Sequence, residues 1–240
     1  MTAARPVQPI GAPVDAHPAK RPERVTLKGR WVTLAPLDAE KHAEALYAGS
    51  HGEGRESVWT YLPYGPFTTL ERFAADLESK ARSADPQFFA VLDNASGRAV
   101  GYLSLMRIDP ANRAIEVGHV MYTPTMHRTP AATEAQYLFA RYVFDELGNR
   151  RYEWKCDALN APSRRAAERF GFTFEGVFRQ HMIVKGRNRD TAWFAMLDHE
   201  WPARKSAYEA WLWPGNFDDQ GAQRTRLSEL MPKGVPGGCG

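Results

Sequence analysis

The segment of this chain best suited to chemistry joins a predicted strand to a predicted helix. It spans residues 122–135, and small residues surround Pro130 within it. The first N–H groups of a helix have no partner inside the helix and carry partial positive charge, so they can hold a phosphate group. Pro130 suits the first helical position, where no N–H donor is needed. Taken alone, however, the pattern favours an ordinary capped helix, because every strand-to-helix loop offers some free amides.

The elements that would position this loop mix strand and helix patterns. Alternating apolar residues predict strands at 25–34 (broken near Gly29), 87–92, 99–108, 114–122, 151–157, 172–184 and 191–197. Helical spacing, with Asp38, Thr68 or Thr69, and Asn160 or Ser163 as caps, predicts helices that start near 38, 69, 131, 160 and 201. The order predicts an α+β (mixed α/β) fold, in which one mixed, mostly antiparallel sheet carries helices on its faces.

The two ends of the chain differ from this middle. Residues 1–24 are Pro-rich without hydrophobic periodicity, and residues 1–30 carry a net charge of +4 (six basic minus two acidic residues). We expect a disordered basic arm at 1–24, a catalytic domain at 25–213 and a Pro/Gly-rich tail at 214–240, in which a short helix around 222–230 has some support. The arm is interpreted as a solvated tail, with a nucleic-acid or ribosome tether as the alternative.

Composition narrows the class of protein. The chain has 43% apolar residues but no apolar run long enough to span a bilayer, and its N-terminus lacks a secretory signal pattern. We therefore expect a soluble, cytoplasmic protein without a membrane partner. The two cysteines, Cys156 and Cys239, form neither a disulfide framework nor a zinc site, and no metal is expected. Nothing in the folded part resembles a basic groove with interleaved aromatics, so a nucleic-acid partner is not expected.

Six motifs together resemble the GNAT superfamily of N-acetyltransferases, in its RimJ/RimL-like branch. They cover about three quarters of the chain and comprise residues 115–121 (IEVGHVM), 132–135 (ATEA), 154–163 (WKCDALNAPS), 167–172 (AERFGF), 175–179 (EGVFR) and 185–190 (KGRNRD). The resemblance implies a sheet in which the parallel strands 114–122 and 151–157 splay apart. It also implies acetyl-CoA as the acyl donor, with its pantetheine arm inserted between these two strands.

The same resemblance assigns cofactor contacts. Backbone amides at Val120, Met121 and Tyr122 would contact the pantetheine and the thioester oxygen, and Asn160 would contact CoA or cap its own helix. The diphosphate loop would comprise His127, Arg128, Thr129, Pro130, Ala131, Ala132 and Thr133. His127 and Pro130 depart from the Gln/Arg-x-x-Gly-x-Gly/Ala pattern of the family, and a proline there removes one amide donor.

Catalytic roles follow by resemblance too. Glu116 is the first candidate for the general base, with a structural ion pair as the equally weighted alternative. His119 is the rival base, and a packed strand histidine is the favoured reading of it. Ser163 would hydrogen-bond the CoA sulfur, because the tyrosine acid of many relatives falls at Ala167. Tyr61 and Tyr64, in the aromatic loop at 59–67, would line the acceptor side. Cys156 is expected to be buried and inert. The last hairpin is flanked by the basic residues Arg179, Lys185, Arg187 and Arg189.

The resemblance thus predicts transfer of an acetyl group from acetyl-CoA to a primary amine, by direct attack in a ternary complex. The acceptor would be a small molecule or a peptide or protein N-terminus. The alternative is a GNAT-fold module that binds or senses acyl-CoA with weak or no catalysis, as the departures at His127, Pro130 and Ala167 suggest. We expect a monomer or a homodimer, as members of this family often are.

Overall fold

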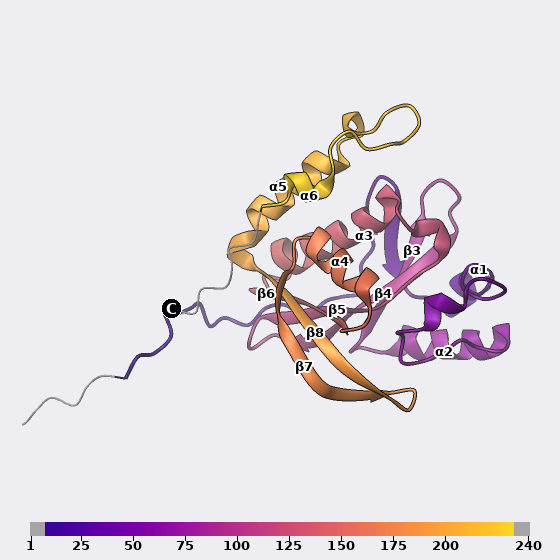
Figure 1. Ribbon diagram of the computed structural model, residues 1–240, viewed down its shortest axis with the longest axis horizontal. Helices are drawn as coiled ribbons and strands as arrows, with labels where there is room; N and C mark the ends of the chain where they lie inside the picture. The colour runs from indigo at the N-terminus through magenta and orange to yellow at the C-terminus, as the bar shows by residue number, and fades with distance from the viewer. Residues whose placement is uncertain (1–7, 233–240) are drawn as a thin grey trace, which may run out of the picture.

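A computed structural model describes residues 8–232 of the 240-residue chain, built around one eight-stranded sheet (Figure 1). The strand order across the sheet is β1-β2-β3-β4-β5-β6-β8-β7, and every neighbouring pair is antiparallel except β5 and β6. The strands are β1 (Leu27–Lys28), β2 (Val32–Pro36), β3 (Gln87–Asp93), β4 (Ala99–Asp109), β5 (Ala114–Tyr122), β6 (Arg151–Asp157), β7 (Thr173–Val184) and β8 (Arg187–Leu197).

Six α-helices accompany the sheet within residues 8–232. They are α1 (Ala39–Ser50), α2 (Leu70–Arg82), α3 (Pro130–Arg141), α4 (Ala161–Arg169), α5 (Trp201–Leu212) and α6 (Leu227–Leu230). Three begin at residues that cap them with a side-chain oxygen: Asp38 accepts from Lys41 N, Thr69 from Arg72 N and Asn160 from Ser163 N. These caps are among those that the sequence predicts.

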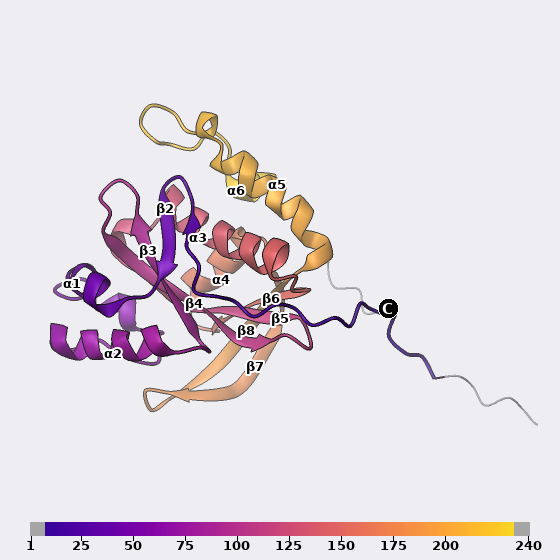
Figure 2. The same cartoon turned by 180° about the vertical axis from the view of Figure 1, so that it is seen from behind.

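The helices cover both faces of the sheet, as expected for this fold class (Figures 1 and 2). Because side chains alternate between the faces of a strand, the sheet contributes to two separate cores. One core, under α3 and α5, includes Phe139, Tyr152 and Phe194. The other lies between α1, α2 and strands β3 and β4, and includes Phe73 and Tyr102. We call the sheet face that bears the second core the acceptor face.

Strands β5 and β6 pair over only part of their length. Their parallel register runs from Ala114 opposite Arg151 to Val117 opposite Trp154. Beyond that point β5 continues to Tyr122 and β6 to Asp157 without pairing to each other. A bulge in β5, where the β4–β5 register shifts and His119 has a positive φ of 50°, lies just past the last pair. The two strands therefore part as predicted.

The part of the N-terminal arm that immediately precedes β1 is docked on the domain, whereas the sequence predicts disorder. Ala19 N donates to Pro110 O at 3.0 Å, Lys20 N donates to Leu147 O at 2.9 Å, and Pro22 is buried. Glu23 N donates to the hydroxyl of Tyr142 at 2.9 Å. The segment is docked because loop carbonyls far along the chain satisfy its backbone donors, a partner set that leaves no local sequence pattern. Residues 1–7 of the expected arm lie outside the described residues.

The C-terminal tail also differs from the expectation. Leu227 is fully buried, and Met231 packs against Gly171 and the core around α5. Asn216 Nδ2 donates to Trp211 O at 3.0 Å and to Thr225 O at 3.2 Å, which holds the connecting loop against α5. The folded unit thus extends past 213 to about 232, and the predicted short helix is realised as α6. Residues 233–240, including Cys239, fall outside the described part.

The expected helix 131–147 is α-helical only to Arg141 and continues as a π-helical turn, Tyr142–Glu146.

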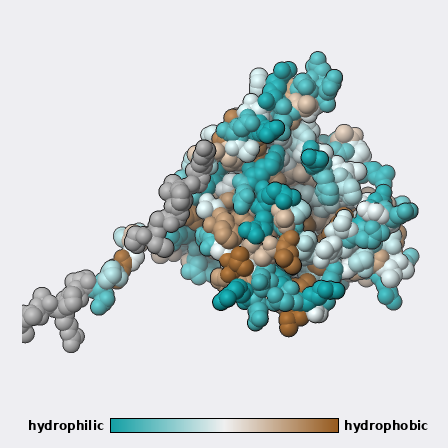
Figure 3. Space-filling view, in the orientation of Figure 1, coloured by the Kyte–Doolittle hydropathy of each residue, from teal (hydrophilic) through white to brown (hydrophobic). Residues whose placement is uncertain are grey.

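The edge strand β7 leaves Phe174, Val177, Phe178 and Ile183 exposed, and Figure 3 shows hydrophobic side chains where β7 lies in Figure 1. Within residues 8–232, no helix has the length and apolar character required to cross a membrane.

Candidate functional site

The parted ends of β5 and β6 leave strand backbone free to pair with a ligand. Thr123 N donates to Val100 O of β4 at 3.0 Å. Because successive amides of a strand point to opposite edges, the amides of Tyr122 and Val120 face the edge that β6 has left, whereas that of Met121 faces β4. Of the three backbone positions predicted for the pantetheine, two are therefore on the open side.

The N-terminus of α3, next to this opening, is not capped by its own side chain. Thr129 is the residue before Pro130, and its hydroxyl donates to Met126 O at 2.8 Å instead of accepting from the helix. Within residues 8–232, the amides of Ala131 and Ala132 donate to no acceptor. α1, α2 and α4 all carry side-chain caps, so α3 is the long helix of this region whose first amides stay available for an anion.

Two backbone amides of the predicted diphosphate loop already donate to nearby backbone carbonyl oxygens. His127 N donates to Pro124 O at 3.1 Å, and Thr129 N donates to Met126 O at 3.4 Å. Arg128 is exposed in the left-handed region, with φ 63°, and its amide has no acceptor among the described residues. The loop amides that have no acceptor among residues 8–232 therefore include those of Arg128, Ala131 and Ala132.

Arg169 adds a positive charge to this end of α3. Its Nη1 donates to the hydroxyl of Thr133 at 2.9 Å, and its guanidinium packs against the Trp211 ring at 5.1 Å. The sequence does not predict a role for this residue, because α4 and α3 are brought together only by the tertiary fold. Two features of the sequence could have pointed to Arg169. It belongs to the motif 167–172, and it lies at the end of the helix that forms α4.

Ser163 lies at the point where β6 leaves β5. Its hydroxyl accepts a hydrogen bond from Trp154 Nε1 at 3.0 Å, and Trp154 is the last β6 residue paired to β5. Because the indole can only donate, this bond does not use the hydroxyl proton of Ser163, and the hydroxyl also lies within hydrogen-bonding reach of the Cys156 thiol. Asn160 caps α4 through Oδ1, 3.1 Å from Ser163 N, and so leaves only its Nδ2 for a ligand.

Two other predicted features of this region can be located directly. Ala167 is fully buried on the core side of α4, so the tyrosine acid of relatives has no equivalent there. Cys156 is buried, and burial raises the pKa of its thiol above the ordinary value. A thiolate nucleophile is correspondingly disfavoured.

Glu116 sits on the acceptor face, one residue before the last β5–β6 pair. It is only 5% exposed, and its Oε2 lies 2.7 Å from Lys155 Nζ and 3.0 Å from Arg107 Nε. Its Oε1 makes no hydrogen bond with the described residues and points towards Gly118, where an added Cβ would lie 3.8 Å away. Burial raises the pKa of the Glu116 carboxyl, although the two cations oppose the shift.

His119 projects from the β5 bulge into a group of aromatic side chains. Its Nδ1 lies 3.1 Å from the Tyr64 hydroxyl, the two rings stack at 5.6 Å, and the Tyr102 hydroxyl donates to that of Tyr64 at 3.4 Å. Burial lowers the pKa of His119 to about 4, and the positive charges of Lys80 and Arg189 add to the shift. His119 is therefore neutral at physiological pH and is held by Tyr64.

Two contacts close the acceptor side around the aromatic loop. The Tyr61 hydroxyl donates to Leu159 O, in the β6–α4 loop, at 3.1 Å. Lys185, at the turn between β7 and β8, donates to Trp59 O at 2.8 Å, which ties the hairpin tip to the same loop. Trp59 itself is buried, as core packing would require. Tyr64 packs against the core under α1 and α2, and Tyr61 contacts the β6–α4 loop.

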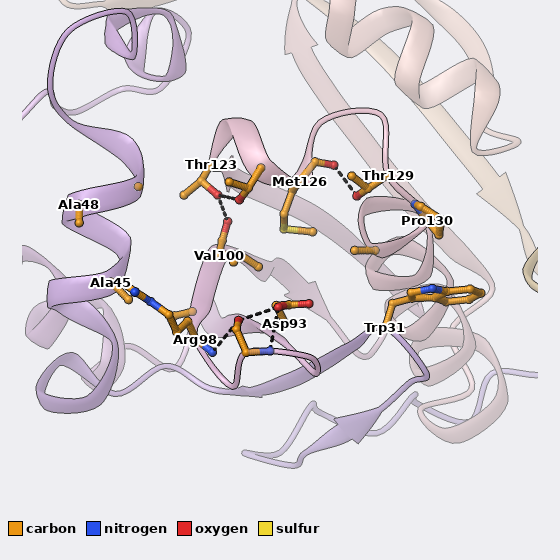
Figure 4. A pocket seen from close by; sticks show the side chains of 15 residues that line it. Trp31, Ala45, Ala48, Asp93, Arg98, Val100, Thr123, Met126, Thr129 and Pro130 are labelled. Carbon is orange, nitrogen blue, oxygen red and sulfur yellow. Dashed lines mark hydrogen bonds between the residues drawn. The ribbon is translucent and has the colours of Figure 1, made fainter. Parts of the chain in front are cut away.

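A cavity of about 510 Å³ lies between the loop before α3 and the C-terminal end of α1 (Figure 4). Trp31, Val100, Met126 and the C-terminal end of α1 line it, and the hydroxyls of Thr123 and Thr129 are already bonded to backbone oxygens. No residue of β6 or α4 borders it. The cavity therefore does not extend to the β6 side of the opening, although Ala131, one of the residues with a free amide, lines it. No three His, Cys, Asp or Glu side chains within residues 8–232 gather into a group able to hold a metal.

Comparison with known proteins agrees with this geometry. The acetyltransferase (GNAT) domain family matches residues 32–173. A crystal structure of a GCN5-related N-acetyltransferase from Brucella melitensis is 56% identical, with a TM-score of 0.87 over 89% of this chain and 97% of that one. A GNAT-family structure from Chromobacterium violaceum is 42% identical, with a TM-score of 0.75 over 83% and 100% of the two chains.

Sequence relatives extend the comparison. A Bacillus subtilis (strain 168) protein named "Putative ribosomal N-acetyltransferase YdaF" is 26% identical over 183 residues, 76% of this chain and 96% of its own length. This relative agrees with the resemblance to the RimJ/RimL-like branch. The family match covers more than half of the chain, and the splayed strands are a feature that the resemblance implied. The chain therefore belongs to the GNAT family and is an acetyltransferase.

Proposed function

We propose that this acetyltransferase uses acetyl-CoA to acetylate a primary amine, by direct attack of the amine in a ternary complex. The observation that carries the proposal is the parting of β5 and β6 directly beside the uncapped N-terminus of α3. Acetyl-CoA would supply the acetyl group as a thioester. The acceptor is a small molecule or a peptide or protein N-terminus.

Binding of the donor would rest on backbone groups. The amides of Arg128, Ala131 and Ala132 would hold the diphosphate, with Arg169 adding positive charge beside Thr133. The exposed edge of β5 at Val120 and Tyr122 would pair with the amide groups of the pantetheine, as an added strand pairs with a sheet edge. An N–H of this edge would then stabilise negative charge on the thioester oxygen.

Proton movement would use Glu116 and Ser163. The amine must be neutral to attack, and the carboxylate of Glu116 would take its proton through water at Oε1, while Oε2 stays with Lys155 and Arg107. Ser163 would donate its hydroxyl proton towards the sulfur of the leaving thiolate. His119 fits a positioning role better than that of a base, because Tyr64 occupies its Nδ1 and its pKa is about 4.

The test is acetyl-CoA turnover with a broad amine panel, in the wild type and in Glu116→Gln. General base catalysis contributes roughly 10²–10⁴-fold, so we expect kcat to fall by about that factor while the Kd of CoA changes less than about twofold. Glu153→Gln is the matched control, because Glu153 also pairs with Lys155, at 2.6 Å. Its kcat should stay within about threefold of the wild type.

Two results would contradict the proposal in different ways. Equal losses in Glu116→Gln and Glu153→Gln would mean that Glu116 acts only through the ion-pair network. Tight CoA binding without turnover on any amine would favour the alternative of a non-catalytic acyl-CoA-binding module, which the alanine at position 167 also fits.

A further inference from the structure

The strands next to the reaction centre present a cation without a carboxylate partner. Arg189 of β8 is half-buried, and its Nε donates to the Thr191 hydroxyl at 3.2 Å. Among residues 8–232, no carboxylate forms an ion pair with Arg189, whereas the cations Arg107 and Lys155 on the same face are both paired to Glu116. A half-buried guanidinium without a counter-charge has lost hydration that a bound anion would replace.

The register places Arg189 close to the opening between β5 and β6. In the β6–β8 ladder Thr191 lies opposite Asp157, and Trp193 lies opposite Lys155, at the level where β6 has separated from β5. The bond from Arg189 to Thr191 draws the guanidinium back to this level. Since neighbouring strands are about 4.8 Å apart, Arg189 is roughly 5–10 Å from the opening.

A large bulge in β7 shapes a hollow beside this cation. Three β7 residues, 179–181, stand against the single residue Asp190 of β8, whose carboxylate accepts from Gln180 N at 2.7 Å and holds the bulge. An open hollow of about 650 Å³ is lined by Phe178, Arg179, Gln180 and His181. The ring of His181 turns inward to the Thr191 hydroxyl, 2.9 Å away, which also receives Arg189.

Two imidazoles in this region lie close to positive charges. Apart from burial, the groups that lower the pKa of His119 are Lys80 and Arg189, and those that lower the pKa of His181 are Arg107, Arg189 and Lys155. No carboxylate opposes either shift. These positive charges favour the neutral form of an incoming amine, which is the nucleophile, but repel an ammonium that carries no compensating charge.

Trp193 adds a polar group that has no partner on this face. Its indole N–H is buried without an acceptor among the described residues, and its ring lies 4.6 Å from that of Phe178 and 3.9 Å from Lys155 Nζ. Buried donors are normally satisfied, so an acceptor supplied by a ligand or its hydration is expected nearby.

We propose that the acceptor is a small amine that also bears an anionic group, a carboxylate or a phosphate, which pairs with Arg189 next to the hollow at the β7 bulge. The inference rests on the proposed acetyl transfer and names its substrate class. The amine and the anion would be separated by roughly 5–10 Å, the spacing set by one strand and a side chain.

The experiment compares acceptors in matched pairs that differ in charge. Amino carboxylates are paired with their amides, and aminoalkyl phosphates with their aminoalcohols, so the two arms distinguish a carboxylate from a phosphate. We expect kcat/KM to be at least tenfold higher for the charged member of one arm, and calorimetry with the CoA-bound protein to show the same order of Kd. In Arg189→Gln, kcat/KM for the charged member should fall at least tenfold and for the neutral member less than twofold.

Two variants serve as controls. Arg187 is exposed two residues along β8, so Arg187→Gln should change neither member of a pair by more than twofold. Arg189→Lys should restore part of the preference because it restores the charge. Turnover with no preference for the charged member, or an equal loss for both members in Arg189→Gln, would overturn this inference alone. Absence of turnover with every amine, together with equal Kd values for the two members, would contradict the proposed function as well.

Discussion

At the scale of single residues, the two candidate bases, Glu116 and His119, differ in the partners of their polar atoms. Glu116 keeps one carboxylate oxygen with Lys155 and Arg107, and the other makes no hydrogen bond with the described residues. His119 has its Nδ1 against the Tyr64 hydroxyl and lies close to positive charges. The geometry thus supports proton transfer at Glu116 and a supporting role for His119.

The lowered pKa of His119 predicts a pH dependence of stability. In the unfolded chain a histidine binds its proton near pH 6.5, whereas His119 in the folded protein binds it only near pH 4. Between these values the unfolded state holds more protons, so the free energy of unfolding falls as the pH drops from 6.5 to 4, by up to about 3 kcal/mol. Urea unfolding at several pH values measures it.

The control for this prediction is an exposed imidazole. His119→Asn should flatten the decline between pH 6.5 and 4, while His199→Asn, at an exposed position, should leave it unchanged. An NMR titration that finds His119 protonating near pH 6.5 would show that its burial and its charged neighbours do not act as described.

At the scale of elements, α3 is tied to the start of the sheet by one carboxylate. Glu134 accepts from Arg30 N and Trp31 N, both at 2.7 Å, and from Val32 N at 2.9 Å. Gly29 packs so closely on this carboxylate that an added Cβ would lie 2.4 Å from Glu134 Cδ. The clamp fixes the first turn of α3 and therefore the amides proposed to hold the diphosphate.

Glu134→Gln tests this clamp. Loss of the charge weakens three hydrogen bonds at a buried site, so we expect the free energy of unfolding to fall by about 2–3 kcal/mol, with a weaker affinity for CoA. Glu44→Gln, at an exposed position of α1, should change stability by less than about 0.5 kcal/mol. A Glu134→Gln protein as stable as the wild type would mean that the amides of the β1–β2 turn find other acceptors.

The elements predictable from sequence are those whose pattern is local. The bounds of β5 and β6 agree with the expected strands 114–122 and 151–157, because alternating side chains mark them. The π-helical turn after Arg141 has no such signature. In the site, the family motifs indicated the loop and Ser163, but the bond from Trp154 to Ser163 and the contact of Arg169 with Thr133 arise from tertiary packing alone.

At the scale of the whole molecule, the segments 19–23 and 227–231 brace the domain. The docked arm bonds to Pro110 and Leu147, and Gln87 Nε2 donates to Glu23 O at 2.7 Å. On the other side, Leu227 and Met231 join the core under α5. The sequence predicts tails here because Pro and Gly interrupt hydrophobic periodicity, although extended segments can dock without it.

Paired truncations measure the contribution of the arm. Removal of residues 1–14 should change the free energy of unfolding by less than about 0.5 kcal/mol. Removal of 1–24 should lower it by about 2–4 kcal/mol, since buried Ala19 and Pro22 and several hydrogen bonds are lost. Equal stability of the two truncated proteins would show that the docking is energetically neutral. Loss of salt-sensitive RNA binding on removal of 1–24 would support the tether alternative.

The most direct test of the donor site is amide hydrogen–deuterium exchange of the full chain with and without saturating CoA. We predict slower exchange in residues 120–133, including the amides of Tyr122, Arg128, Ala131 and Ala132, with smaller effects in 154–163. Unchanged exchange in these segments, or protection confined to the cavity beside α1 at residues 45–49 and 93–100, would contradict a donor held between β5 and β6 at the start of α3.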